Sequence, residues 1–346
     1  MSEDCLTLSI WAPVQCNKSS ALYAVLVVLS SEWFRRGHVE EYASIWEGLS
    51  ASGNLVVVFI NHRLGMLGFL DPEVNDAPGN VGIHDAFLAL TWISEHIRAF
   101  HGNPNFLVGL GDGSGSYIVS LDLFAAIWGR KRFFRRLILH GISPASLLPK
   151  VGSFSSISSS FKCDRDGDVA SSVACLRDMP LSQIYESMEK QKPLLFMPSC
   201  DKPPIGHCGD VLSQLPMSPQ HKEILCGYRS EDARKLFDHY MMQQAGRSHK
   251  EPSEAFDLLQ RFFTGKPPRR EFKELPLGLL QLLNQSNLQG FRELMVDVVL
   301  RCPLLRLVQE AVLKGIKVYL YALETRSVVF EPALTKEEII DFVKTG

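Results

Sequence analysis

Three glycines within five residues, at positions 111, 113 and 115, constrain this 346-residue chain more than any other feature. The segment reads GDGSG and follows the aliphatic run 106–110. A strand that turns sharply into a helix needs small residues two positions before and two positions after its centre, because larger side chains there collide with the strand and the helix. Gly111 and Gly115 supply those flanks, so Gly113 is the predicted centre of the turn.

The residue at the centre decides what chemistry such a turn can support. In the pattern Gly-x-Ser-x-Gly the central serine is exposed as a nucleophile. Moving the centre to Ser114 would place the side chains of Asp112 and Ser116 at the crowded flanks, so we interpret Gly113 as the centre and Ser114 as the residue after it. Taken alone, the segment fits a plain glycine-rich turn equally well.

Alternating apolar runs predict an α/β fold. Strands buried on both faces are expected at 24–29, 55–60, 106–110 and 136–140, and apolar-faced helices at 85–100 and 116–128. This alternation predicts a mainly parallel central sheet with helices on both faces. Ligand sites in such folds form at the carboxyl ends of the strands, where the GDGSG turn lies.

Four ordered stretches resemble the type-B carboxylesterase and cholinesterase family, a branch of the α/β-hydrolases. SEDCLTLSIWAP at 2–13 is similar to the family's SEDCLYLNIWxP, and NHRLGMLGFL at 61–70 is similar to NYRLGxxGFL. The stretch from GNVGIHD at 79–85 to Pro104 resembles the helix that leads into the elbow strand, and Cys163 and Cys175 have the spacing of a small disulfide loop. The resemblance implies a single domain over 1–346, incomplete at the amino terminus and near the carboxyl terminus.

The resemblance also implies roles for site residues. Gly113 occupies the position of the nucleophilic serine, and Asp232 that of the triad acid. An ordinary capping or surface carboxylate is the alternative for Asp232. Where the family has the glycines of its oxyanion loop, this chain has Ser31, Glu32 and Trp33. A carboxylate in that loop would oppose a developing negative charge.

No histidine lies where the family places its triad base, beyond the strand expected at 318–321. The last histidine is His249, and the ending FVKTG resembles the family's helix after the histidine loop. We therefore expect that loop to be deleted. His239 and His249 are substitutes only in principle, because they follow Asp232 so closely that they would lie on the neighbouring helix.

Composition excludes several other functions. The formal net charge of −2 gives no electrostatic case for nucleic acid, and the basic run 130–136 is interpreted as a solvated loop, as is the serine-rich segment 153–160. No apolar stretch approaches the length of a membrane span. We expect no cofactor and no metal, because the candidate zinc ligands are irregularly spaced and include no Cys-x-x-Cys pair. These candidates are Cys200, His207, Cys208 and Cys226.

The resemblance assigns several structural features. It implies a Cys163–Cys175 disulfide and leaves Cys5 and Cys302 without their family partners. It also implies a supporting ion pair between Arg63 and Asp85. Asn17 and Asn284 begin glycosylation sequons, which are used only if the chain is exported.

Together these features predict a cholinesterase-like protein that lacks ester hydrolysis and acts in binding or adhesion, with an unknown protein partner. The resemblance implies an extracellular, secreted protein, although no signal peptide is present. One alternative is a remnant or partial gene product of a detoxifying carboxylic-ester hydrolase. A third hypothesis is residual esterase activity through Ser114 or Ser116 with His239.

Overall fold

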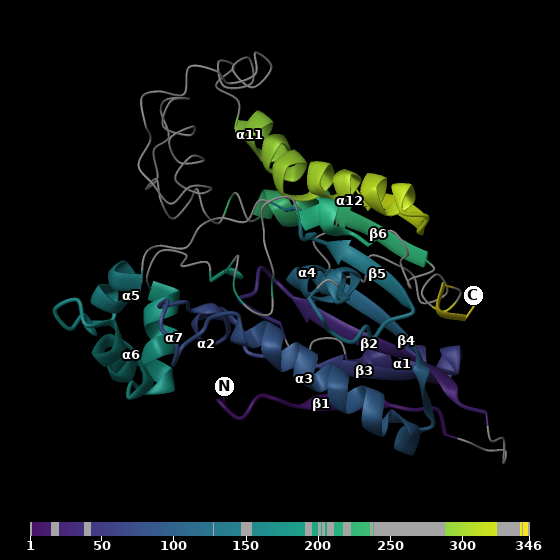
Figure 1. Cartoon of the computed structure of the whole chain (residues 1–346), viewed down its shortest axis with the longest axis horizontal. Helices are drawn as coiled ribbons and strands as arrows, with labels where there is room; N and C mark the ends of the chain where they lie inside the picture. The colour runs from purple at the N-terminus through teal and green to yellow at the C-terminus, as the bar shows by residue number, and fades with distance from the viewer. Residues whose placement is uncertain are drawn as a thin grey trace.

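A seven-stranded sheet forms the centre of the molecule in the computed structural model (Figure 1). The structure describes residues 2–14, 21–37, 43–126, 128–146, 154–190, 196–199, 202, 205, 211–216, 223–235, 238, 288–323, 340 and 342–344. The strands are β1 (Leu8–Trp11), β2 (Tyr23–Ser31), β3 (Val56–Ile60), β4 (Gly102–Gly113), β5 (Arg136–Gly141), β6 (Glu223–Arg229) and β7 (Lys317–Leu323). Their order is β1-β3-β2-β4-β5-β6-β7, and every neighbouring pair is parallel except β1 with β3.

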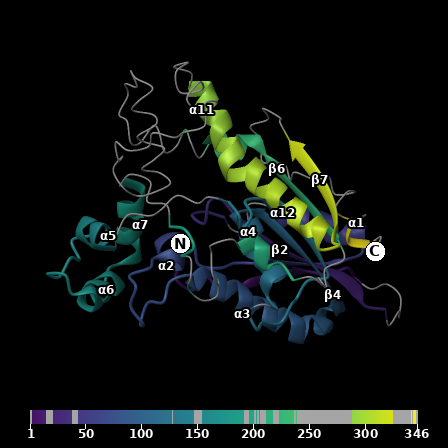
Figure 2. The same cartoon turned by 45° about the horizontal axis from the view of Figure 1, so that its top comes forward.

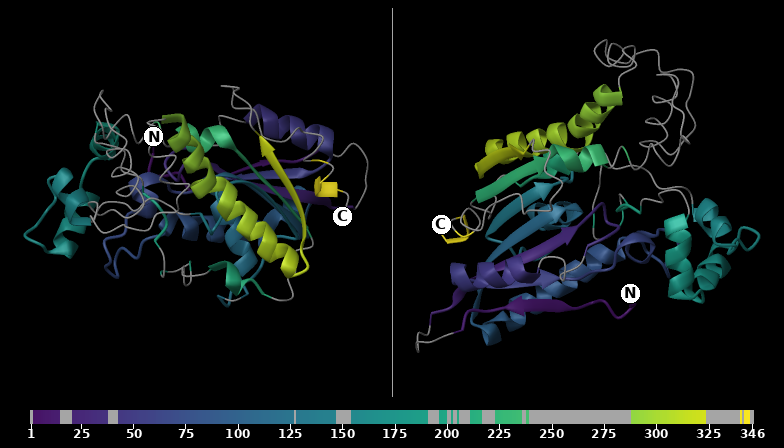
Figure 3. Two further views of the ribbon diagram at one scale, coloured as in Figure 1. Left: turned by 90° about the horizontal axis from the view of Figure 1, so that it is seen from above. Right: turned by 180° about the vertical axis from the view of Figure 1, so that it is seen from behind.

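Helices cover both faces of this sheet (Figure 2; Figure 3, left). The α-helices are α1 (Ala43–Gly53), α2 (Gly65–Phe69), α3 (Val81–His96), α4 (Ser114–Ser120), α5 (Phe154–Ser160), α6 (Val169–Arg177), α7 (Leu181–Lys190), α11 (Leu288–Met295) and α12 (Cys302–Leu313). Shorter turns are the 3₁₀ segments η2 (Ile97–Phe100), η3 (Leu121–Phe124) and η4 (Val211–Gln214), and the π segment η5 (Val296–Arg301).

Alternate residues of β2 belong to two separate hydrophobic cores, as a strand buried on both faces requires. Val25, Val27 and Leu29 join the core under α3, α4 and α12, whereas Leu26 and Val28 join the core under α1. The predicted α/β-hydrolase architecture, a mainly parallel sheet between two helical layers, is confirmed.

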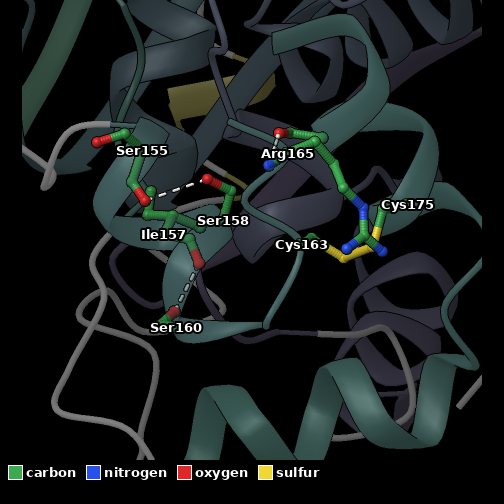
Figure 4. Close-up of a disulfide and its surroundings, with 8 residues drawn as sticks. Ser155, Ile157, Ser158, Ser160, Cys163, Arg165 and Cys175 are labelled. Atoms are coloured by element: carbon green, nitrogen blue, oxygen red, sulfur yellow. Dashed lines mark hydrogen bonds between the residues drawn. A yellow bond between two sulfur atoms is a disulfide. The ribbon is translucent and has the colours of Figure 1, made fainter. Parts of the chain in front are cut away.

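Two local predictions were wrong. The helix expected over 116–128 begins earlier, at Ser114, and gives way to the 3₁₀ turn η3 after Ser120. The serine-rich segment 153–160, expected to be a loop, contains α5. Ile157 is buried there, and Ser160 Oγ donates to the Ile157 carbonyl, so apolar burial and local hydrogen bonds outweigh the low helix propensity of serine (Figure 4).

The helices α5, α6 and α7 form a small lobe that lies beside α2 at one end of the molecule (Figure 1). The predicted disulfide between Cys163 and Cys175 is confirmed, and it joins the loop after α5 to α6 across 12 positions of sequence (Figure 4). Arg165 Nη2 also lies 3.3 Å from the Cys175 sulfur. Throughout the described ranges, no helix combines the length and apolar character that crossing a bilayer requires.

Candidate functional site

The turn between β4 and α4 has the glycine spacing that close packing demands. A Cβ at Gly111 would lie 2.4 Å from the Ser116 Cα, and a Cβ at Gly115 would lie 2.0 Å from the Leu29 carbonyl oxygen. Both distances are shorter than any side chain tolerates, so only glycine fits either flank. Gly113, at the centre, has φ +59° and ψ −121°, a left-handed conformation that favours glycine.

The space beside Gly113 is occupied by β2. Ser31 and Gly113 are register partners at the carboxyl ends of two neighbouring parallel strands. A Cβ at Gly113 would lie 2.4 Å from the carbonyl oxygen of Ser31. A serine at this position would therefore need the end of β2 to move.

The hydroxyl of Ser114, the residue after the centre of the turn, is hydrogen-bonded to both Ser31 and Phe34. Its Oγ donates to the Ser31 carbonyl at 2.8 Å and accepts from the Phe34 amide at 2.7 Å. The Ser31 hydroxyl, also 2.7 Å away, must then be the donor in the contact between the two side chains, because Ser114 has a single hydroxyl proton. The residue is 1% exposed. Ser114 therefore fastens α4 to the end of β2.

The turn after β2 contains the predicted oxyanion-loop positions. Trp33 and Phe34 adopt φ angles of +51° and +58°, a left-handed conformation that costs a side-chain-bearing residue about 1–2 kcal/mol. The turn is closed by the Glu32 amide, which donates to the Arg36 carbonyl at 2.7 Å. The Phe34 amide donates to Ser114 Oγ. The backbone of this turn therefore adopts left-handed φ angles at two residues that are not glycine.

Carboxylates gather at the same edge of the sheet. Asp232 lies in the helical segment that follows β6. Burial, together with the charges of Asp112 and Glu32, raises the pKa of Asp232 to about 7, against the opposing charges of Arg229 and Lys235. The predicted acid position thus faces the end of β4 and the turn after β2. Its surroundings favour the neutral carboxyl over a carboxylate that would orient a histidine.

A histidine on the sheet itself was missed by sequence reasoning. His140, near the end of β5, is the register partner of Asp112, and on its other side is Gly227, followed by Tyr321. The Tyr321 hydroxyl lies 2.8 Å from His140 Nδ1, and the two rings are parallel. Any Cβ at Gly227 would come within 2.5 Å of the Tyr321 ring, so the bare glycine lets the tyrosine reach the histidine.

His140 is a neutral, buried group at neutral pH. Burial, together with the charge of Arg229, lowers its pKa to about 4, against the charge of Asp112, which raises it. Its Nε2 has no hydrogen-bond partner in the described part of the chain. Ser30 Oγ donates to Asp112 at 2.9 Å and extends the polar row to β2. A histidine near the end of a buried strand next to the glycine turn was the available signal, but the chain order of the triad points only to histidines that follow the acid.

The expected ion pair lies beneath this region. Arg63 contacts the two carboxylate oxygens of Asp85 through Nε and Nη2, each at 2.7 Å, and its backbone amide donates to the same group at 3.2 Å. The Asp85 side chain is 6% exposed. This bidentate contact joins the turn after β3 to α3, which supports the fold rather than chemistry.

Several of the predicted residues lie in parts of the chain that the structure does not describe. Asn17, Asn284, His239, His249, Cys200, His207 and Cys208 lie outside the described residues. Cys226 is buried, which raises its thiol pKa to about 12, and Cys5 and Cys302 are free thiols. Among the described residues no group of histidine, cysteine and carboxylate side chains is arranged to hold a metal ion.

Comparison with known proteins identifies the family. The model of the carboxylesterase family matches residues 1–340. Thyroglobulin of Bos taurus is 31% identical over 196 residues, which are 55% of this chain and 7% of that protein. Acetylcholinesterase-1 of Trittame loki is 33% identical over 142 residues, 40% of this chain and 25% of the relative. Cholinesterase of Mus musculus is 39% identical over 126 residues, 36% of this chain and 20% of the relative.

The chain thus covers a quarter or less of each of these relatives. The family model covers nearly the whole sequence, and the sheet with its glycine turn has the architecture that this family predicts. The chain belongs to the carboxylesterase family.

Proposed function

We propose that this chain is a non-catalytic member of its family that acts in binding or adhesion. The observation that carries the proposal is the position of the Ser31 carbonyl, 2.4 Å from the point where a side chain at Gly113 would begin. Gly113, at the centre of the turn, carries no side chain that could act as a nucleophile, and a serine there would collide with the end of β2.

The neighbouring groups support the same conclusion. Ser114 Oγ is held by Ser31 and Phe34, so its hydroxyl is unavailable for attack on an ester. In the turn after β2, Ser31, Glu32 and Trp33 occupy the positions of the family's donor glycines, and the Glu32 carboxylate would oppose a developing negative charge.

An extracellular location is part of the proposal. The Cys163–Cys175 disulfide supports it, because disulfides persist in oxidising compartments. Glycosylation at Asn17 and Asn284 would follow from export. A partner protein, as yet unidentified, would bind the surface of the folded domain.

The test uses the purified full chain with an aryl ester and a fluorophosphonate probe, which reacts only with an activated serine. We expect neither hydrolysis nor labelling, and we expect Gly113→Ser to restore neither. Gly129→Ser is the matched control, since Gly129 also has positive φ, +65°, but no atom lies within 4 Å of its added Cβ.

The outcomes separate the competing hypotheses. Labelling of the native chain at Ser114 or Ser116 would overturn the proposal in favour of residual esterase activity. Labelling of the Gly113→Ser protein at position 113 would show that the end of β2 opens readily, so closure would not explain inactivity. Failure of the native chain to accumulate as folded protein would support the remnant of an ester hydrolase.

A further inference from the structure

The two edges of the central sheet differ in what they expose. β1 forms one edge with four half-buried residues, whereas β7 forms the other with seven residues, of which four are exposed. Tyr319 is 41% exposed and Leu320 is 46% exposed. None of the described strands lies on the outer side of β7, and Figure 2 shows this strand at the margin of the sheet beside α12. A further strand therefore has access to the outer backbone of β7.

β7 lacks the charges that usually protect an open edge. Its one charged residue, Lys317, stands at its first position. The Lys317 ammonium donates to Glu223 of β6 at 3.2 Å and lies 4.9 Å from the centre of the Tyr319 ring. From Val318 to Leu323 the strand has neither a charged residue nor a proline. A long apolar edge of this kind is a template for pairing with another strand.

The side chains of β7 alternate between the two faces of the sheet. Val318 packs on the core under α12, and Tyr321 packs on the core under α1. The Tyr319 ring contacts Phe342, which also belongs to the α1 side. Leu320, one position further, therefore lies on the α12 side. A strand that pairs with β7 has to match this alternation, since a slip of one residue exchanges the two faces.

A second copy of β7 matches both the faces and the backbone. In a parallel sheet, alternate residues of an edge strand turn their backbone groups toward the neighbouring strand, and the residues between them turn these groups outward. A two-fold axis at Leu320, the middle residue, places outward residues opposite outward residues along the whole strand. The two copies of Lys317 then stand at opposite ends of the pair, about 20 Å apart. Lys317 faces Leu323, and Tyr319 faces Tyr321.

We propose that β7 is a dimerisation edge, at which two copies of this chain join their sheets by antiparallel β7–β7 pairing. The occupant is a second copy because the strand is self-complementary: apolar side chains meet apolar side chains, and no like charges are opposed. The proposal goes beyond the binding role proposed above and is independent of it, because it concerns the edge of the sheet rather than the glycine turn.

The experiment measures the mass of the full chain by sedimentation equilibrium. Cys302, an exposed free thiol, is replaced by serine in every sample so that no disulfide at this position joins two chains. We expect a dimer at micromolar concentration. Leu320→Lys should raise its dissociation constant more than about ten-fold, because two ammonium groups would meet at the axis. Leu88→Lys on α3, where the leucine is 68% exposed, is the matched control and should leave the dissociation constant unchanged.

A charge swap tests the register. Leu320→Glu should weaken self-association as Leu320→Lys does, whereas an equimolar mixture of the two variants should form a heterodimer, because opposite charges then meet at the axis. The same two substitutions at Tyr319 should give a much smaller preference for the heterodimer, since Tyr319 faces Tyr321 rather than its own copy. Circular dichroism verifies that each variant is folded.

Three outcomes would overturn the proposal. A chain that is monomeric throughout would do so in favour of a partner strand from another protein. A dimer that survives Leu320→Lys, or a mixture of the two Leu320 variants that fails to associate, would show that the two-fold axis does not pass through this residue.

Discussion

The β4–α4 turn and the turn after β2 meet at the same edge of the sheet, and they preserve their backbone shapes in opposite ways. The first keeps glycine at each of its three special positions, 111, 113 and 115. The second adopts left-handed angles at Trp33 and Phe34, where glycine would be the unstrained choice.

Packing explains the difference. At the β4–α4 turn a Cβ would meet backbone atoms that belong to the sheet and the helix, which cannot move separately. At the turn after β2, Phe34 has left-handed strain but is fully buried, with its ring against Phe69 and Tyr117. Side-chain burial offsets the strain there. The fold thus has glycine where backbone contacts leave no room for a side chain, whereas at Phe34 a buried ring offsets the left-handed strain.

The largest effect should come from Gly115→Ala. The added Cβ would lie 2.0 Å from the Leu29 carbonyl, so β2 and α4 must separate. We expect a loss of more than about 4 kcal/mol in the free energy of unfolding, measured by urea denaturation. Gly129→Ala, with positive φ and open space, should lose only about 1 kcal/mol. Equal losses would show that the contact with the Leu29 carbonyl does not fix Gly115 as glycine.

Phe34 tests the other side of the comparison. Phe34→Ala should cost about 3–5 kcal/mol of unfolding free energy, because a buried ring is lost. Phe34→Gly should cost about 1 kcal/mol less than Phe34→Ala, since it relieves the left-handed strain. In ordinary positions glycine is the more destabilising of the two. If the glycine variant proves the less stable in urea titrations, the turn holds no strain at this residue.

Sequence reasoning predicted the parts of the molecule that local rules determine. The glycine spacing around Gly113 and the buried strand runs depend on contacts within one unit of strand, turn and helix. The contact of Ser31 with Gly113 and the pairing of His140 with Tyr321 depend on register across several strands, with 181 positions between the last two residues. Register is set by the whole sheet, so no local pattern reveals it.

A smaller effect is expected at Ser114, which connects the two turns. Ser114→Ala removes the acceptor of the buried Phe34 amide and the donor to the Ser31 carbonyl. We expect a loss of about 2 kcal/mol in unfolding free energy, because buried polar groups are left unpaired. Ser52→Ala, at an exposed serine that bonds its own helix, is the control. If Ser114→Ala left the unfolding free energy unchanged, these hydrogen bonds would not hold the native Ser114 hydroxyl in place. That result would weaken the proposed function.

The smallest effect concerns how stability depends on pH at this edge of the sheet. The pKa of Asp232 in the folded chain is about 7, above its ordinary value of 3.8, so the folded state binds the proton more tightly. This contribution stabilises the fold at low pH and is lost as pH rises through about 7. His140 and His62 have the opposite effect, because their folded pKa values, about 4, lie below the ordinary 6.5. Their contribution is present above about pH 6.5 and is lost as pH falls toward 4.

Because two histidines oppose one aspartate, the unfolding free energy of the native chain should rise between about pH 4 and 6.5 with a slope of about one proton. Asp232→Asn removes the one contribution to the unfolding free energy that decreases as pH rises. The unfolding free energy of the variant, measured by urea titration, should therefore rise more steeply with pH across that range. Asp178→Asn, on the exposed end of α6, should leave the profile unchanged. Parallel profiles for the native chain and the Asp232 variant would mean that this carboxyl is solvated, and would remove it from the group formed with Asp112 and Glu32.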